Sequence, residues 1–286
     1  MNKFRVLVFL LIIPCFANAQ QTPLLSHYFE NLNIINPSTV GYNEGYEIKF
    51  NGRQQWSNFS DSPIRNSSLS LSKAFGVNGV GLSVYTDNSG NLNHSGLSLK
   101  YAYKTLLSDK NHLFFGLAGG MVNRSINNIS EYDYSNITFD NNWVPNASFG
   151  ISFKRKDLMI GTSIEGLLES DFGFTEEENI FERHIFSFAK YAFKASENVL
   201  ISPSALYKAP IRGNTQYEVN LNLSYKQSIT FGVGYRGGFV KQNQFGPTIN
   251  LGFNLGKISS LYSQDIVMND VSGYSSGTSE LSLKYV

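Results

Sequence analysis

The chain almost lacks cysteine, since Cys15 is its one thiol among 286 residues. Cys15 lies inside the apolar stretch near the N-terminus, so a chain that has lost its leader would carry no thiol. This excludes structural disulfides, a thiol nucleophile and cysteine metal sites from the mature protein. Lipidation of Cys15 is the weaker alternative, because Pro14 directly before it is unfavourable for lipoprotein processing.

Charge is scarce and nearly balanced. Asp, Glu, Lys and Arg make up 16% of the sequence, and the formal net charge is +1. Such a chain offers no basic stripe for nucleic acid, and we discard that class of partner. The chain is not disordered either, because aromatic residues alone make up 14% of it.

Long apolar runs are missing after residue 19, which excludes a membrane-spanning helix from the rest of the chain. Three elements of a signal peptide precede that point: the basic pair Lys3 and Arg5, the apolar run Val6 to Phe16, and the cleavage motif Ala17-Asn18-Ala19. We expect residues 1–19 to be removed and residues 20–286 to form one domain. An uncleaved anchor is the weaker alternative, because the apolar run is short for a bilayer.

The sequence instead alternates. Apolar residues recur at every second position over most of the chain, with glycine, serine or asparagine between them, as in 219–225 and 249–255. Successive side chains of a strand point to opposite faces, so each segment has one apolar face and one small or polar face. Polar faces with few Lys and Glu residues favour the interior of a membrane barrel over the surface of a soluble sandwich.

The connections between these segments support a barrel. We predict strands that begin near residues 45, 65, 79, 92, 112, 143, 157, 181, 197, 215, 228, 247, 258 and 278. Long connections, such as 86–93 and 124–142, alternate with short ones, such as 75–78 and 226–227. This alternation predicts an all-β protein, a transmembrane antiparallel β-barrel of about 14 strands with short periplasmic turns and longer extracellular loops. Both termini would then lie in the periplasm.

The segment before the first predicted strand, residues 20–44, is too long for a simple lead-in. We expect it to tuck into or beneath the barrel. If residues 46–56 form a strand, Arg53 lies on the face opposite Trp56. An arginine that faces lipid near the middle of the bilayer is costly, so Arg53 should point into the lumen. There it either braces the barrel or contacts a plug or a cargo. Small, uncharged inner residues predict a filled or narrow interior.

The region from Gln20 to Asp87 carries more than alternation. It contains an I-N-P stretch followed by glycine, an R-x-Q-W stretch with a proline after it, and a V-Y-T-D-N-S-G stretch. This region resembles the PorP/SprF family of Bacteroidota outer-membrane proteins, which belong to type IX secretion. The resemblance is carried by Asn36, Pro37, Gly41, Arg53, Gln55, Trp56, Pro63, Asp87 and Gly90. Ser62 departs from the usual Gly or Ala, and Val286 ends the chain where members often end on an aromatic residue.

The resemblance implies an accessory barrel without enzymatic activity and without a cofactor. It would help to export and to attach to the cell surface cargo proteins that bear a C-terminal type IX signal domain. Its partners would be outer-membrane lipid, such cargo and periplasmic components of the secretion machinery, with a link to gliding motility. A general porin or hydrophobic-solute transporter on the same scaffold is the alternative. A secreted soluble β-sandwich adhesin is a third hypothesis.

Motifs for chemistry are weak. The histidines His27, His94, His112 and His184 show no zinc-binding spacing. Serine is abundant, so a serine near His94 or His184 occurs by chance, and an outer-membrane hydrolase is disfavoured. The acidic run at 176–178 predicts a solvated loop, with a cation or cargo contact as the alternative. The basic run at 154–156 predicts a tight turn.

Overall fold

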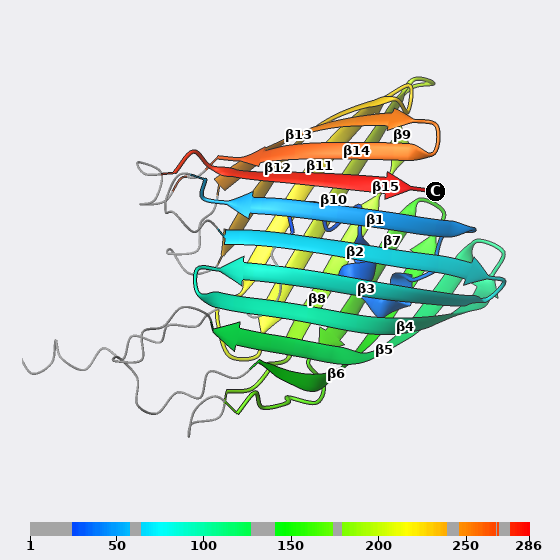
Figure 1. The fold of residues 1–286 in the computed structure, drawn as a ribbon. Coiled ribbons are helices and arrows are strands. Elements are labelled where there is room, and N and C mark those ends of the chain that lie inside the picture. Colours follow the sequence, from blue (N-terminus) through cyan, green and yellow to red (C-terminus); the bar gives the residue numbers. More distant parts are fainter. Residues whose placement is uncertain are drawn as a thin grey trace, which may run out of the picture.

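The strands close into one antiparallel barrel (Figure 1). This computed structural model describes residues 25–57, 64–126, 141–173, 179–238, 246–266, 268 and 275–286. Tight turns, such as those that join β2 to β3 and β6 to β7, lie at the end of the barrel where the C-terminus also lies, on the right in Figure 1. We call this the turn end and the opposite end the loop end.

The described residues hold fifteen strand segments and two short 3₁₀ helices. The helices are η1 (Leu32–Ile34) and η2 (Pro37–Thr39). The strands are β1 (Tyr46–Gln55), β2 (Ile64–Phe75), β3 (Asn78–Ser89), β4 (Leu92–Ser108), β5 (Asn111–Ile126), β6 (Asn142–Arg155), β7 (Leu158–Glu165), β8 (His184–Tyr191), β9 (Phe193–Lys194), β10 (Val199–Pro210), β11 (Gln216–Tyr225), β12 (Ile229–Gly238), β13 (Gly246–Leu255), β14 (Ile258–Asp265) and β15 (Thr278–Tyr285). Among these residues no helix is long and apolar enough to cross a bilayer.

The described segments occupy fourteen strand positions, because β9 continues β8 along β10. Lys190 in β8 pairs with Ser204, and Phe193 in β9 pairs with Ile201 in the same register. Pro203 stands in β10 beside the interruption and has no N–H to donate to the ladder. Each strand pairs antiparallel with its neighbours, and β1 pairs with β15 to close the barrel. The predicted fold, an antiparallel barrel of about 14 strands, is confirmed.

Alternating exposure follows the alternating sequence. In β11 the side chains of Leu221 and Leu223 are 49% and 42% exposed, whereas Asn220 and Asn222 between them are 5% exposed. The apolar residues therefore face outward along the whole strand, as they do on most of the barrel. A chain that faces water would bury them, so this surface suits a surrounding of lipid.

Predicted and observed strand starts agree closely, with two informative differences. The eighth strand begins at His184 and not near residue 181. The long connection predicted at 86–93 is wrong, because β3 and β4 pair up to Ser89 and Leu92 and leave only Gly90 and Asn91 in the turn. Gly90 adopts a positive φ of 62° there. The polar, turn-forming residues of this region predicted a loop, but they continue the two strands of the β3–β4 hairpin.

The N-terminal segment occupies the inside of the barrel. Residues 25–45, which we call the plug, include η1 and η2, drawn in blue behind β2 and β3 in Figure 1. Tyr28, Phe29 and Leu32 are almost fully buried and pack with Phe186 and Phe188 of β8. The interior is therefore filled by the chain's own N-terminal segment.

The interior is not uncharged, and that expectation is wrong. Buried charged side chains point inward from many strands: Glu47, Lys49, Arg53, Lys100, Arg124, Lys208, Glu218, Arg236, Asp265 and Glu280. No strand carries more than three of them, and they stand among serines and asparagines, so no single segment looks charged. They meet only when the barrel closes.

Candidate functional site

Glycines on three strands form a cradle for the middle of the plug. Inward-facing Gly79, Gly116 and Gly150 lie on β3, β5 and β6, and an added Cβ on any of them would overlap plug atoms. At Gly116 that overlap is with the backbone of Pro37 and Ser38. The backbone of the plug can approach the wall only because these residues lack side chains. We call Gly79, Gly116 and Gly150 the glycine cradle.

Asn36 shapes the plug where it meets the cradle. Its side-chain oxygen accepts hydrogen bonds from the N–H of Ser38 at 2.9 Å and from the hydroxyl of Ser38 at 2.7 Å, which caps η2. Its amide nitrogen donates to the carbonyl of Thr162 at 3.0 Å. Pro37 follows at the first helical position, where its missing N–H costs nothing. Asn36 is fully buried, so its polar atoms depend on these partners.

Five charged side chains from five strands meet inside the loop-end half of the barrel. We call Arg53, Glu218, Arg236, Asp265 and Glu280 the charge cluster. Arg53 donates to Glu280 at 2.9 Å and to Asp265 at 2.7 Å, and Arg236 donates to Glu218 at 2.8 Å. All five are buried. Removing one partner of such a pair leaves a buried charge uncompensated, at a cost of about 3–5 kcal/mol.

The charge cluster holds the first described residues of the plug. The backbone N–H groups of Ser26 and His27 donate to the carboxylate of Glu280 at 2.7 and 2.9 Å. The hydroxyl of Ser26 accepts from Arg53 at 2.6 Å and from Arg236 at 2.7 Å. The plug is therefore bound at one end by electrostatics and in its middle by close packing.

Burial and nearby charges inside the barrel shift the pKa values of two side chains of the plug, His27 and Glu30. Burial lowers the pKa of His27, although Glu280 opposes that effect, so the imidazole is neutral at neutral pH. Its Nδ1 lies 2.8 Å from the hydroxyl of Ser282. Burial would raise the pKa of Glu30, but Lys284 and Lys190 outweigh it and hold that pKa well below its usual range.

A second segment enters the lumen from the loop end. Phe172 and Phe181, on the connection between β7 and β8, are each 1% exposed. Both rings contact the ring of His94, with centroids 6.1 and 5.6 Å away, and Arg124 lies 4.5 Å above Phe172. The lumen is thus occupied from both sides, which is not the arrangement of an open pore.

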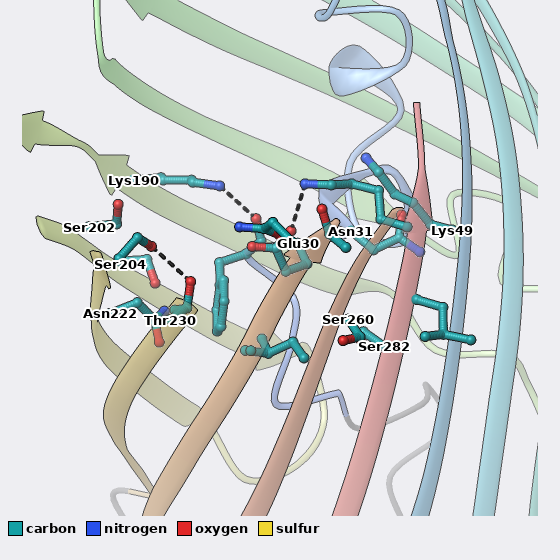
Figure 2. Close-up of a pocket in the computed structure, with 18 of the residues that line it drawn as sticks. Glu30, Asn31, Lys49, Lys190, Ser202, Ser204, Asn222, Thr230, Ser260 and Ser282 are labelled. Atoms are coloured by element: carbon teal, nitrogen blue, oxygen red, sulfur yellow. Dashed lines mark hydrogen bonds and ion pairs between the residues drawn. The ribbon is translucent and has the colours of Figure 1, made fainter. Parts of the chain in front are cut away.

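A cavity of about 260 Å³ remains between the plug and the wall at the turn end, and we call it the turn-end cavity (Figure 2). Hydroxyl and amide side chains of β10 to β12 line its wall, among them Ser202, Asn222 and Thr230. On the plug side Lys49 and Lys190 approach Glu30 from opposite sides (Figure 2). Lys284 pairs with Glu30 at 3.0 Å.

The structure brings four residues of the sequence motifs into this interior. Asn36, Pro37 and Gly41 belong to the plug, and Arg53 belongs to the charge cluster. Gly41 has a φ of 68°, and a Cβ there would lie 2.7 Å from the Cα of Gly79. The positive φ and the close approach both require glycine at this position.

The remaining motif residues lie elsewhere. Gln55 ends β1 on the inner face, and Trp56 follows with a φ of 53°. Trp56 therefore lies one residue beyond β1, so the predicted strand 46–56 is one residue too long and alternation within β1 does not assign Trp56 a face. Asp87 lies in β3 opposite His94 and accepts a hydrogen bond from Ser89 at 3.1 Å. Pro63 and the acidic run at 176–178 lie outside the described residues.

Sequence reasoning missed the other four members of the charge cluster. Glu218, Arg236, Asp265 and Glu280 each occupy an inward position of an alternating strand. The alternation that placed Arg53 in the lumen would have placed these four there as well. Which of them pair could not be read, because the partners of Arg53 lie 212 and 227 residues away in sequence.

The sequence model of the family described as "Type IX secretion system membrane protein PorP/SprF" matches residues 17–285. The chain belongs to the PorP/SprF family. It is an outer-membrane β-barrel of the type IX secretion system. None of the curated proteins matches the chain.

Solved outer-membrane proteins share the fold. The toluene transporter TodX of Pseudomonas putida is 8% identical, with 89% of this chain and 94% of that chain covered at a TM-score of 0.56. A Pseudomonas aeruginosa FadL homologue is 11% identical, with 87% and 92% covered at 0.52. The Acinetobacter baumannii protein Omp33 is 7% identical, with 84% and 97% covered at 0.51. At these identities the similarity shows the fold alone.

The described ranges hold no group of three or more His, Cys, Asp or Glu side chains arranged to bind a metal ion. What the interior does offer is a surface of charged and hydrogen-bonding groups. Such groups hold polypeptide, as they already hold the plug.

Proposed function

We propose that this PorP/SprF protein assists type IX secretion and attaches to the cell surface cargo that bears a C-terminal signal domain, without enzymatic activity of its own. The family match over residues 17–285 carries this proposal. The occupied, charged lumen supports it, because a barrel that fills its own interior is suited to hold partners at its ends and poorly suited to conduct solutes.

We propose that residues 1–19 are removed as a signal peptide and that residues 20–286 form one barrel domain. Its turn end and both termini would lie in the periplasm, with the loop end facing outward and the plug running back into the lumen. Apart from the tight β3–β4 hairpin, long connections lie at the loop end and tight turns at the turn end, and this pattern supports the orientation. Val286 donates its N–H to the carbonyl of Lys257 in the β13–β14 turn at 3.1 Å, so the chain ends at the turn end.

The proposed partners are outer-membrane lipid, secreted cargo with the signal domain and periplasmic type IX components, with no nucleic acid. An affinity pull-down of the native protein from detergent-solubilised outer membranes, read by mass spectrometry, tests them. Recovery of a large secreted protein with that domain, together with periplasmic machinery, is the expected result. Recovery of the barrel alone, with conductance in planar bilayers, would contradict the proposal.

The second candidate is a transporter for hydrophobic solutes. The similarity in fold to the toluene transporter TodX favours it. The interior argues against it, because a route for apolar solutes is lined mainly by apolar side chains, and here buried Arg, Lys, Glu and Asp side chains cross the lumen. Uptake of toluene into proteoliposomes would support this candidate, and uptake no faster than into empty liposomes would exclude it.

A further inference from the structure

The turn-end cavity has an excess of hydrogen-bond donors on its plug side. Lys49, Lys190 and Lys284 reach it from β1, β8 and β15. An ammonium group can donate three hydrogen bonds. Among the described residues each of these groups has one acceptor, namely Glu47 at 3.0 Å, the carbonyl of Phe29 at 2.9 Å and Glu30 at 3.0 Å, respectively.

Asn31 adds a buried donor that has no partner in the described part of the chain. Its side-chain oxygen accepts from the hydroxyl of Ser70 at 2.9 Å, which directs the amide nitrogen elsewhere. That nitrogen is buried and has no hydrogen-bond partner among the described residues, although Asn31 lines the cavity. A buried donor without a partner is costly. A ligand that accepts hydrogen bonds would remove this cost.

The net charge of the cavity lining also favours a ligand that is negatively charged. Three lysines line the cavity and Glu30 is its one lining carboxylate in the described chain, so the lining is positive overall. The rest of the lining is largely neutral, and its hydroxyl and amide groups both donate and accept. Ser202, Asn222 and Asn254 are among them, and Figure 2 shows Ser202 and Asn222 on the same side as Lys190, across from Lys49. The cavity thus combines anion-binding lysines with general hydrogen-bonding groups.

We propose that the turn-end cavity binds an acidic, extended peptide segment of a partner protein. Carboxylates would pair with Lys49, Lys190 and Lys284, and the peptide backbone would bond to the hydroxyl and amide wall. A volume of about 260 Å³ admits a few residues of an extended chain and no folded domain. The choice of a peptide rests on the proposed function, in which the partners are proteins that meet the turn end in the periplasm.

Binding of a fluorescein-labelled hexaglutamate peptide to the purified full chain in neutral detergent, read by fluorescence anisotropy, tests this site apart from secretion. We expect hexaglutamate to bind and hexalysine not to bind. Lys190→Gln should weaken binding about tenfold, the worth of one charge-assisted hydrogen bond. Lys257→Gln is the matched control, since Lys257 is an exposed lysine in a turn at the same end, outside the cavity.

Ser202→Phe provides a second variant that fills the cavity without a change of charge, and it should abolish binding while heat-modifiable gel mobility shows an intact barrel. Absence of hexaglutamate binding would overturn the proposal. Equal weakening by Lys190→Gln and Lys257→Gln would overturn it too, because that result indicates attraction by net charge alone. Binding of digalacturonate in place of hexaglutamate would assign the cavity to an acidic glycan and refute the peptide. A failed pull-down beside positive peptide binding would count against the secretion role alone.

Discussion

The two halves of the lumen hold the same plug in different ways. Around β3 to β6, the glycine cradle lets the backbone of the plug lie directly on the wall. Around β11 to β15, side chains of the wall hold the plug, and the charge cluster binds Ser26 and His27 by hydrogen bonds. Close packing tolerates almost no change in volume, whereas charged groups act over a longer distance and respond to pH and salt. The comparison suggests one permanent attachment and one that conditions can weaken.

Arg53→Ala should have the largest effect. It leaves Glu280 and Asp265 without their main cation, and we expect a loss of about 3–5 kcal/mol of stability in urea unfolding in detergent micelles. Amide hydrogen exchange should rise in residues 25–31 and stay low in residues 36–41. Arg65→Ala is the control, because Arg65 is exposed on the outer face of β2. Equal exchange across both stretches would refute the division of the plug into two attachments.

Gly116→Val should show the opposite pattern. The new side chain overlaps the backbone of Pro37 and Ser38, and overpacking of this kind costs about 1–3 kcal/mol. Exchange should rise first in residues 36–41. Gly119→Val is the matched control, because Gly119 lies on the same strand, and a Cβ there meets nothing within 4 Å. If both variants behave alike, the cradle does not seat the plug.

The alternation that predicted the strand positions is a local property of the sequence, because each strand has one face toward lipid and one toward the lumen. The attachment of the plug depends instead on residues that are far apart in the sequence. Arg53 could be placed in the lumen from its position in β1, but its pairing with Glu280 exists only because β1 closes the barrel against β15. The eighth strand was predicted to begin near residue 181, yet Phe181 precedes β8 and its ring is buried in the lumen with Phe172. Whether such a residue lies in a strand or in a loop depends on its tertiary contacts, which the local sequence does not show.

Asn36→Ala tests what a side chain of the plug adds to the attachment at the glycine cradle. The variant removes the cap on Ser38 and the bond to Thr162, and we expect a loss of about 1–2 kcal/mol in the same urea measurement. Asn91→Ala in the exposed β3–β4 turn should change stability by less than about 0.5 kcal/mol. A loss that matches that of Asn91→Ala would show that the cradle alone fixes the middle of the plug.

His27 should give the smallest effect and the sharpest test of the charged attachment. Its pKa is lowered in the seated plug, so a released plug, with a histidine near the usual 6.5, binds the proton more tightly. The contribution of His27 to the stability of the bound plug is therefore fully present above pH 6.5 and decreases as the pH falls below that value. Glu280, Glu30 and Asp265 oppose the shift and Arg53 adds to it, so the change stays modest.

Between pH 7.5 and 5.5 we expect exchange in residues 25–31 to rise about threefold, after correction for intrinsic exchange rates, while residues 36–41 stay constant. His27→Gln should remove this dependence and leave the barrel intact by gel mobility. If exchange rises equally in His27→Gln, groups other than His27 cause the pH dependence, and the proposed role of His27 is refuted. A flat profile in the variant, with a rise in the wild type, would tie the pH response of the plug to its contact with Glu280 and Ser282.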